Sequence, residues 1–387
     1  MDAIVLSGGA AYGAYEVGVL KALSEKKGFD PEIVTGTSVG AFNAAIVASE
    51  SIARLEEIWR DEIPEHGTHG NGVMRVRGNP LPYLNPPQPA NLISHLIGDS
   101  VFLTRIGIKR GEAFLTSEGG AASRLSELVD LSAFITCEPL RHTIRRTLSF
   151  ERLRQTTKKL RIIATDWQEG VARIFSNEDI TDADGESIIL ASTAIPGIFP
   201  PVRLEGKVFV DGGVVMNTPL KPALKAGADT IHVVSLDPTI RKIETSEYDN
   251  TLESIMRVLQ ISIGSAVRED ITTASWINAG IDVLMKMRRD PPDPNVDLAD
   301  FIRVADQLRQ RAAAGTPYKR VTIHHYQPSH GLGSPIGLLD FTSSNIERLI
   351  ATGYEDTLRH MCNGCGCVLP LETAAPDVMS ASSVLAS

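Results

Sequence analysis

Cysteine is scarce in this sequence, and no stretch of it is apolar enough to cross a membrane. Only 4 cysteines occur among 387 residues, so a disulfide framework of the kind that holds small secreted domains is excluded. The least charged long stretch, residues 33–49, is shorter than the roughly 20 residues that a transmembrane helix needs. We therefore expect no transmembrane segment.

Positive charge is also in deficit. The formal net charge of −9 argues against a nucleic-acid-binding protein. The basic region of a secretory signal peptide is missing as well, since Met1 and Asp2 lead directly into the apolar residues 3–6. With 43% hydrophobic and 22% charged residues, the composition is that of a globular protein of one large domain or two. We expect it in the cytoplasm, either free or peripheral to a membrane.

What the sequence does contain is a tight, glycine-bounded turn, Gly36-Thr37-Ser38-Val39-Gly40. Residues 32–35 before it predict a short buried strand, and the alanine-rich residues 41–48 after it predict a closely packed helix. A serine on such a turn points outward, and the two glycines relieve the crowding around it. This arrangement is typical of a nucleophile elbow. The alternative is an ordinary turn in which Ser38 caps the helix.

A second glycine-rich bend, Gly8-Gly9-Ala10-Ala11-Tyr12-Gly13, follows an apolar strand at residues 4–6 and precedes a predicted helix at residues 14–26. Backbone N–H groups in such a bend can face an anion, either a nucleotide phosphate or the oxyanion of a tetrahedral acyl intermediate. A dinucleotide-binding fold would place an acidic residue at the end of the next strand. Ser38 stands there instead, so the sequence favours an oxyanion hole.

The motif Asp211-Gly212-Gly213 ends an extended stretch at residues 207–210, downstream of a small-residue helix predicted at residues 188–194. An aspartate at the end of an apolar strand can lie at the rim of the sheet beside Ser38. The alternative is a hairpin turn, for which Asp-Gly-Gly is a favourable sequence.

Taken in order, four blocks of the sequence resemble the motifs of the patatin-like phospholipases. They are the glycine-rich loop (8–13), the elbow (36–40), a stretch of small residues and prolines (191–201) and the Asp-Gly-Gly motif (211–213). The resemblance covers roughly residues 1–237 and, more weakly, 338–354. It implies an α/β fold with three layers (α/β/α), a mostly parallel central sheet and helical cap insertions.

The resemblance also implies roles for single residues. Ser38 would be the nucleophile and Asp211 the general base of a two-residue catalytic site that cleaves fatty-acyl esters of phosphoglycerolipids and other glycerolipids, as a phospholipase A or lysophospholipase. The other implied site residues are the oxyanion donors Gly8, Gly9 and Ala10, the elbow glycines Gly36 and Gly40, and the supporting glycines Gly13, Gly212 and Gly213. No cofactor and no metal is implied. The expected partner is a lipid or phospholipid substrate, met by transient contact with a membrane surface.

Two residues depart from the family pattern. Ala10 replaces the third glycine of the loop, which keeps the backbone N–H if the φ angle permits it. Tyr12 replaces the usual basic residue before Gly13, which puts in doubt any charge stabilisation or head-group contact by that side chain.

Two other functions remain open. An α/β-hydrolase would use Ser38, a later carboxylate, and His324, His325 or His330, although such enzymes build several strands before the elbow and this chain has room for one. A catalytically silent lipid-binding, nucleotide-binding or storage protein would keep the fold without turnover.

The chain is expected to divide into a catalytic core (1–237) with a cap insertion (65–135), a helical extension that ends in a final strand and helix (238–361), and a disordered tail (362–387). In the tail, Cys362, Cys365 and Cys367 form a C-x-x-C-x-C cluster that could hold a metal with His360. No second ligand pair is visible, so the sequence favours a reduced, mobile tail.

Overall fold

The computed structural model describes most of the chain outside the expected cap, the helical extension and the C-terminal end. It describes residues 1–64, 72–76, 96–105, 108, 135–236, 271, 272, 275, 278, 280, 320–333, 335–362 and 367–369. The cap and the extension lie largely outside these residues, and their boundaries stay predictions. Among the described helices, none is both long and apolar enough to cross a bilayer.

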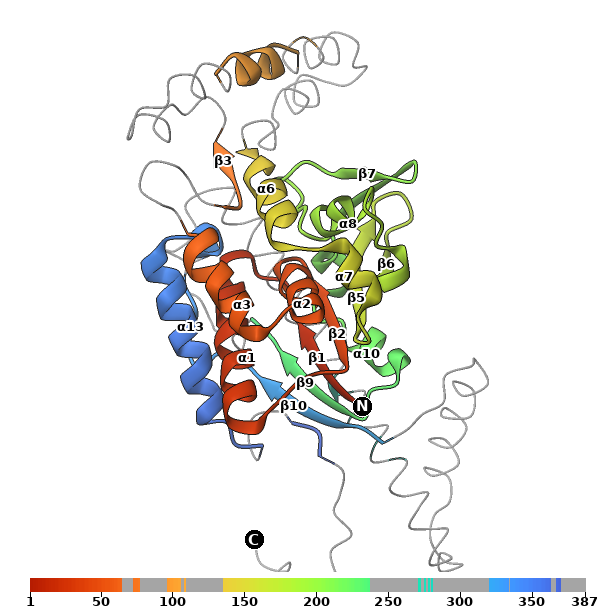
Figure 1. Cartoon of the computed structure of the whole chain (residues 1–387), viewed down its shortest axis with the longest axis vertical. Helices are drawn as coiled ribbons and strands as arrows, with labels where there is room; N and C mark the ends of the chain where they lie inside the picture. Colours follow the sequence, from red (N-terminus) through yellow and green to blue (C-terminus); the bar gives the residue numbers. More distant parts are fainter. Residues whose placement is uncertain are drawn as a thin grey trace, which may run out of the picture.

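An eight-stranded sheet forms the centre of the molecule (Figure 1), in the order β10-β9-β1-β2-β5-β8-β7 with β6 paired to β5. Pairing is parallel from β10 through to β5 and antiparallel among β5, β6, β7 and β8. The mostly parallel sheet expected from the sequence is confirmed. The strands are β1 (Asp2–Leu6), β2 (Ile33–Thr37), β5 (Lys159–Asp166), β6 (Val171–Ser176), β7 (Val202–Leu204), β8 (Lys207–Asp211), β9 (Thr230–Val234) and β10 (Thr322–Tyr326).

Apolar cores cover both faces of this sheet, because successive side chains of a strand point to opposite faces. In β1, Ile4 and Leu6 belong to one core, whereas Ala3 and Val5 belong to the other. A strand buried on both faces reads as a continuous apolar run, as residues 3–6 do. The larger core contains side chains of α1 (Gly13–Lys27), α2 (Val39–Ser49), α8 (Gly185–Ser192) and α13 (Ser343–Leu358), and the smaller one those of α10 (Leu220–Ala226).

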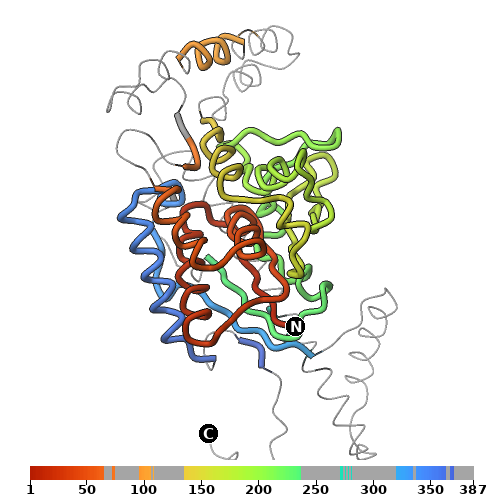
Figure 2. Tube along the Cα trace, viewed as in Figure 1, coloured from red at the N-terminus to blue at the C-terminus, as the bar shows by residue number. Residues whose placement is uncertain are grey.

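Helices α1 and α13 come from opposite ends of the chain and lie side by side (Figure 2). Their backbones meet at two glycines: a Cβ on Gly18 would overlap the backbone of Ile350, and one on Gly353 would overlap that of Tyr15. Helix α13 is therefore an integral part of the fold. This contact attaches the C-terminal part of the chain to the N-terminal part.

Short elements connect these layers. A separate two-stranded sheet of β3 (Arg75–Val76) and β4 (Ile135–Thr136) joins segments at the two ends of the expected cap. Further helices among the described residues are α3 (Ile52–Glu57), a π-helical turn (Ile58–Glu62), α6 (Glu138–Thr147), α7 (Phe150–Gln155), α9 (Gly213–Met216), residues 96–105 and the 3-10 segments Ala10–Tyr12, Asn177–Asp179 and Pro335–Leu339.

Part of the expected tail is ordered. Val368 forms an antiparallel bridge with Ile323 of β10, so the expectation of disorder from residue 362 does not hold for residues 367–369. Residues 363–366 and 370–387 lie outside the described part of the chain.

Candidate active site

Ser38 lies on the turn between β2 and α2, in a backbone conformation that few residues adopt. Its φ is 56° and its ψ is −128°. A non-glycine residue held in such a region costs on the order of 1–3 kcal/mol, and such strain is concentrated at functional sites. The turn closes only because Gly36 and Gly40 lack side chains: a Cβ on Gly36 would overlap the Gly40 backbone, and one on Gly40 would overlap that of Leu6.

The strand register brings Asp211 to Ser38. Thr37, directly before the serine, pairs with Ile163 of β5, and Asp211 pairs with the next residue of β5, Ala164. The two ends therefore meet on the same edge of β5, although 173 residues separate them in the chain. The Ser38 hydroxyl donates a hydrogen bond of 2.6 Å to Asp211 Oδ2. Both residues are buried, with exposed fractions of 4% and 5%.

Burial dominates the electrostatics of the Asp211 carboxyl. It raises the pKa of Asp211 to about 7, against the opposing effect of hydrogen bonds from Ser38 and from the Gly213 N–H. The Gly213 N–H donates to Asp211 Oδ1 at 2.7 Å, so each carboxyl oxygen has one donor. A carboxyl with a pKa near neutrality can accept a proton near pH 7, which an ordinary surface aspartate does poorly.

The glycine-rich loop lies against the serine. A Cβ on Gly8 would be 2.9 Å from the Ser38 Cβ. The Gly8 N–H donates to Asn217, at 3.1 Å to the side-chain oxygen and 3.3 Å to the backbone oxygen. Asn217 Nδ2 in turn donates to the Gly8 oxygen at 3.2 Å. Of the three amides that the sequence assigned to an oxyanion hole, that of Gly8 is therefore already engaged.

The amides of Gly9 and Ala10 differ from that of Gly8. They lie at the start of the 3-10 segment Ala10–Tyr12, where helix geometry leaves N–H groups unpaired. Within the described ranges, neither amide has a hydrogen-bond partner. Ala10 has a φ of 47°, so it adopts the glycine-like conformation that the family's usual glycine would take there. Tyr12, only 5% exposed, is part of the core and cannot replace a basic side chain in contact with solvent.

The supporting glycines pack at close approaches around this site. Gly13 faces the side chain of Val39, and a Cβ on Gly212 would overlap the backbone of Ile163. A Cβ on Gly213 would be 2.7 Å from Asn217 Oδ1 and 3.0 Å from Asp211 Oδ1.

Two polar residues that position the glycine loop and the elbow were not predicted from the sequence. Asn217 fixes the glycine loop, as described above. Ser192, at the end of α8, accepts a hydrogen bond of 3.0 Å from the Ser38 N–H and donates one of 2.6 Å to the Ile163 oxygen. The only available signal was position: Ser192 falls in the small-residue block, and Asn217 follows the Asp-Gly-Gly motif.

A buried network also connects the glycine loop with the elbow helix. Glu16 accepts hydrogen bonds from the Ser7 N–H at 2.7 Å and from Asn43 Nδ2 at 2.8 Å. Asn43 in turn accepts a hydrogen bond of 2.7 Å from the Trp59 indole. Burial raises the pKa of Glu16 well above its usual value, and the bonds from Asn43 and Ser7 act against that effect. The network fixes the loop and the elbow relative to each other.

An apolar cleft that opens to solvent adjoins Ser38. Its lining is almost entirely aliphatic and aromatic, with Thr193 and Ser38 as its polar members. The lining residues are Ala10, Ser38, Val39, Phe42, Trp59, Ile63, Val73, Leu140, Thr193, Ile195, Phe199, Leu339 and Phe341.

The histidines of the alternative triad are placed elsewhere. His324 and His325 belong to β10, which β9 and β1 separate from β2 in the sheet. His325 Nε2 lies 2.6 Å from the Ser235 hydroxyl, and His330 is exposed and lies 2.9 Å from Ser329. The Ser38 hydroxyl is directed instead to Asp211.

Fold and site together place this chain among the α/β proteins that present a serine on a nucleophile elbow at the end of parallel strands. More specifically, it belongs to the patatin-like phospholipase family, whose sequence model matches residues 4–224, more than half of the chain.

Individual relatives match over a short segment. Patatin-like phospholipase domain-containing proteins of Chaetomium globosum and Neurospora crassa are 48% identical over 56 residues, which is 14% of this chain and 6% of each relative. The chain thus matches a small part of these much longer relatives. Among solved structures, that of VipD from Legionella pneumophila is similar with a TM-score of 0.38 and 16% identity, covering 92% of this chain and 66% of VipD.

Proposed function

We propose that this chain is a serine acyl hydrolase in which Ser38 attacks the carbonyl carbon of a lipid ester and Asp211 accepts the serine proton. The observation that carries the proposal is the 2.6 Å hydrogen bond between the Ser38 hydroxyl and the buried Asp211 carboxyl. It meets the reach that a nucleophile and its general base require. Family membership supports the reaction class, and the raised pKa of Asp211 supports its role as the base.

In the first step, the Ser38 oxygen bonds to the carbonyl carbon while its proton moves to Asp211. The C=O electron pair shifts onto the carbonyl oxygen, and the N–H groups of Gly9 and Ala10 are the donors that we assign to it. Gly8, held by Asn217, has the role of fixing this loop. One such donor contributes on the order of 10²- to 10³-fold in rate.

The tetrahedral intermediate then collapses. The bond to the alcohol breaks, and the departing oxygen takes the proton from Asp211. A water molecule next attacks the acyl-serine and loses its proton to the same carboxylate, and collapse of the second intermediate returns the proton to Ser38 and releases the fatty acid.

Two features support a fatty-acyl ester of a glycerolipid, met at a membrane surface, as the substrate. The apolar cleft beside Ser38 can accept an acyl chain. Apolar side chains are also exposed: Val214 and Val215, close after Asp211, are 42% and 40% exposed, and Ile97 and Val101, within the expected cap, are 59% and 63% exposed. Val214 and Val215 are adjacent in the chain, and neighbouring exposed apolar side chains of this kind suit contact with lipid.

The dependence of kcat/KM on acyl-chain length tests whether the cleft binds the acyl chain. For p-nitrophenyl esters from acetate to octanoate, we expect kcat/KM to rise by up to about fourfold per added CH₂ until the cleft is filled, because burying one CH₂ contributes about 0.8 kcal/mol. Phospholipids and lysophospholipids assayed in parallel identify the natural head group.

The Leu339→Asp variant places a carboxylate in the lining of the cleft and should flatten this dependence while sparing acetate hydrolysis. Leu358→Asp, on a 52% exposed leucine of α13, is the matched control and should keep the dependence. Equal kcat/KM for acetate and octanoate in the wild-type protein would exclude the cleft as the acyl site.

A further inference from the structure

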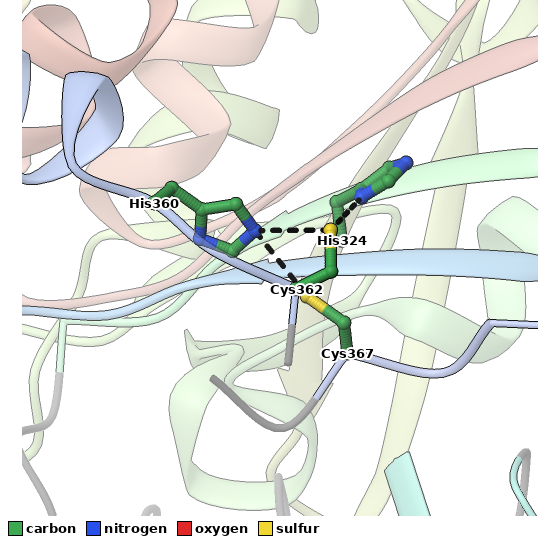
Figure 3. A group of neighbouring side chains, drawn as sticks. All are labelled: His324, His360, Cys362 and Cys367. Atoms are coloured by element: carbon green, nitrogen blue, oxygen red, sulfur yellow. Dashed lines mark hydrogen bonds between the residues drawn. The ribbon is translucent and has the colours of Figure 1, made fainter. Parts of the chain in front are cut away.

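A group of histidines and cysteines lies apart from the Ser38 site, on the edge strand β10 and the chain after α13. His324, His360, Cys362 and Cys367 each place one potential ligand atom so that all four atoms lie within 4.8 Å of one another (Figure 3). His324 is on β10, His360 follows α13, and both cysteine sulfurs point toward the His360 ring. All four side chains are half-buried.

We propose that these four residues bind one Zn²⁺ ion, as a structural site that fastens the end of the chain to the sheet. Two thiolates and two imidazoles form a common ligand set of closed, four-coordinate structural zinc sites. Tetrahedral coordination by two sulfur and two nitrogen atoms favours zinc over the harder cations that prefer oxygen.

The distances within the group fit a tetrahedron around zinc. With Zn–S bonds of about 2.3 Å and Zn–N bonds of about 2.0–2.1 Å, the S···N edge of such a tetrahedron is about 3.6 Å. Cys362 Sγ lies 3.4 Å from His324 Nδ1 and 3.8 Å from His360 Nε2. Cys367 Sγ lies 3.3 Å from His360 Nε2. The three sulfur–nitrogen distances therefore bracket the expected edge.

The surroundings also suit bound thiolates and a fixed ligand frame. The backbone N–H of His325 donates to Cys367 Sγ at 3.3 Å, the kind of outer contact that orients a metal ligand. The His360 ring packs on Tyr326 at a centroid distance of 4.4 Å. The site thus has ligands from two segments and support from the strand that lies under it.

A zinc ion here would strengthen the contact between the end of the chain and the edge strand β10, which is small without it. Val368, next to Cys367, exchanges two backbone hydrogen bonds of 2.8 and 2.9 Å with Ile323 at the edge of the sheet. A single bridged pair is a weak attachment, and the outer edge of a sheet needs covering. His324, the neighbour of Ile323, supplies the second ligand pair together with His360. The sequence did not reveal His324 as a partner of the cysteines because His324 precedes Cys362 by 38 residues.

The test begins with metal content. Full-length protein, purified without a polyhistidine tag or chelator, is expected to carry one zinc per chain by elemental mass spectrometry. His324→Gln and Cys367→Ser should each lose the ion, because the described ligand set is then incomplete. His330→Gln, Cys137→Ser and Cys365→Ser are the matched controls and should keep it. Zinc retained by His324→Gln, or lost by Cys365→Ser, would overturn this ligand set.

Two further readouts examine geometry and role. Replacement by Co²⁺ should give the strong visible absorption of a tetrahedral site with a thiolate charge-transfer band, and the weak spectrum of an octahedral ion would contradict the site. Removal of zinc by a chelator should lower the Tm by roughly 5–10 °C in the wild type and in the controls, but not in the ligand variants. Ester hydrolysis that falls in proportion to zinc content at a temperature where the fold is intact would contradict the structural role.

Discussion

Replacement of Ser38 by alanine is expected to lower kcat/KM for ester hydrolysis by about 10⁴- to 10⁶-fold, the range seen when a catalytic nucleophile is removed. Alanine cannot form the acyl intermediate, and the donors of the glycine loop then have no bound oxyanion to stabilise. Steady-state hydrolysis of p-nitrophenyl octanoate measures the effect.

Two comparisons make this result specific. Ser344→Ala changes an exposed serine on α13 and should keep full activity. The far-ultraviolet circular dichroism of Ser38→Ala should match that of the wild type, since the change removes only the hydroxyl oxygen. Retention of more than about a tenth of the wild-type rate would eliminate Ser38 as the nucleophile, because such a residue cannot be nearly dispensable.

Replacement of Asp211 by asparagine is expected to lower kcat/KM by about 10²- to 10⁴-fold, the contribution of a general base. Asparagine nearly preserves the shape of the side chain and can satisfy both neighbouring groups, by accepting from the Gly213 N–H and donating to the Ser38 oxygen. The loss should therefore reflect proton transfer rather than collapse of the site.

The pH dependence of kcat/KM provides a second test of Asp211 as the base. The base must be ionised, and burial raises the pKa of Asp211 to about 7. Wild-type kcat/KM should therefore rise with pH through about 7 and level off above it, since kcat/KM reports the free enzyme. In Asp211→Asn the residual rate should lack this inflection, whereas Asp182→Asn, at a surface aspartate, should keep it. An inflection near pH 7 that persists in Asp211→Asn would assign the base to another group.

The same pKa makes an independent prediction for the stability of this variant. The folded-state pKa of Asp211 is raised above that of the unfolded chain, so between about pH 4 and pH 7 the folded state holds a proton that the unfolded state has released. The stability contributed by this group therefore falls as the pH rises. Relative to the wild type, Asp211→Asn should gain in Tm from pH 5 to pH 8.

The elbow and the aspartate could be predicted from the sequence because local chemistry determines them. Gly36 and Gly40 are needed wherever a strand turns so tightly into a helix, and Asp211 ends an apolar strand before two glycines. The strand register that brings Asp211 to Ser38 is a property of β5, which pairs with both segments. No local pattern encodes that pairing, so only the family resemblance joined the two residues.

The oxyanion donors could be predicted from the sequence only in part. A glycine-rich loop indicates that amides are available, but not which of them are already paired. The side chain of Asn217 occupies the Gly8 amide from a segment far along the chain. His324, which we propose as a zinc ligand, was missed for the same reason, since its partners lie beyond α13.

The most direct measurement is the site of covalent modification by a fluorophosphonate, in which the nucleophile's oxygen bonds to phosphorus and fluoride leaves. Peptide mass spectrometry of the labelled protein should locate the adduct on Ser38, and labelling should be absent in Ser38→Ala and slowed in Asp211→Asn. An adduct on any other residue of a protein that hydrolyses esters, or no adduct at all on the folded protein, would contradict the Ser38–Asp211 mechanism.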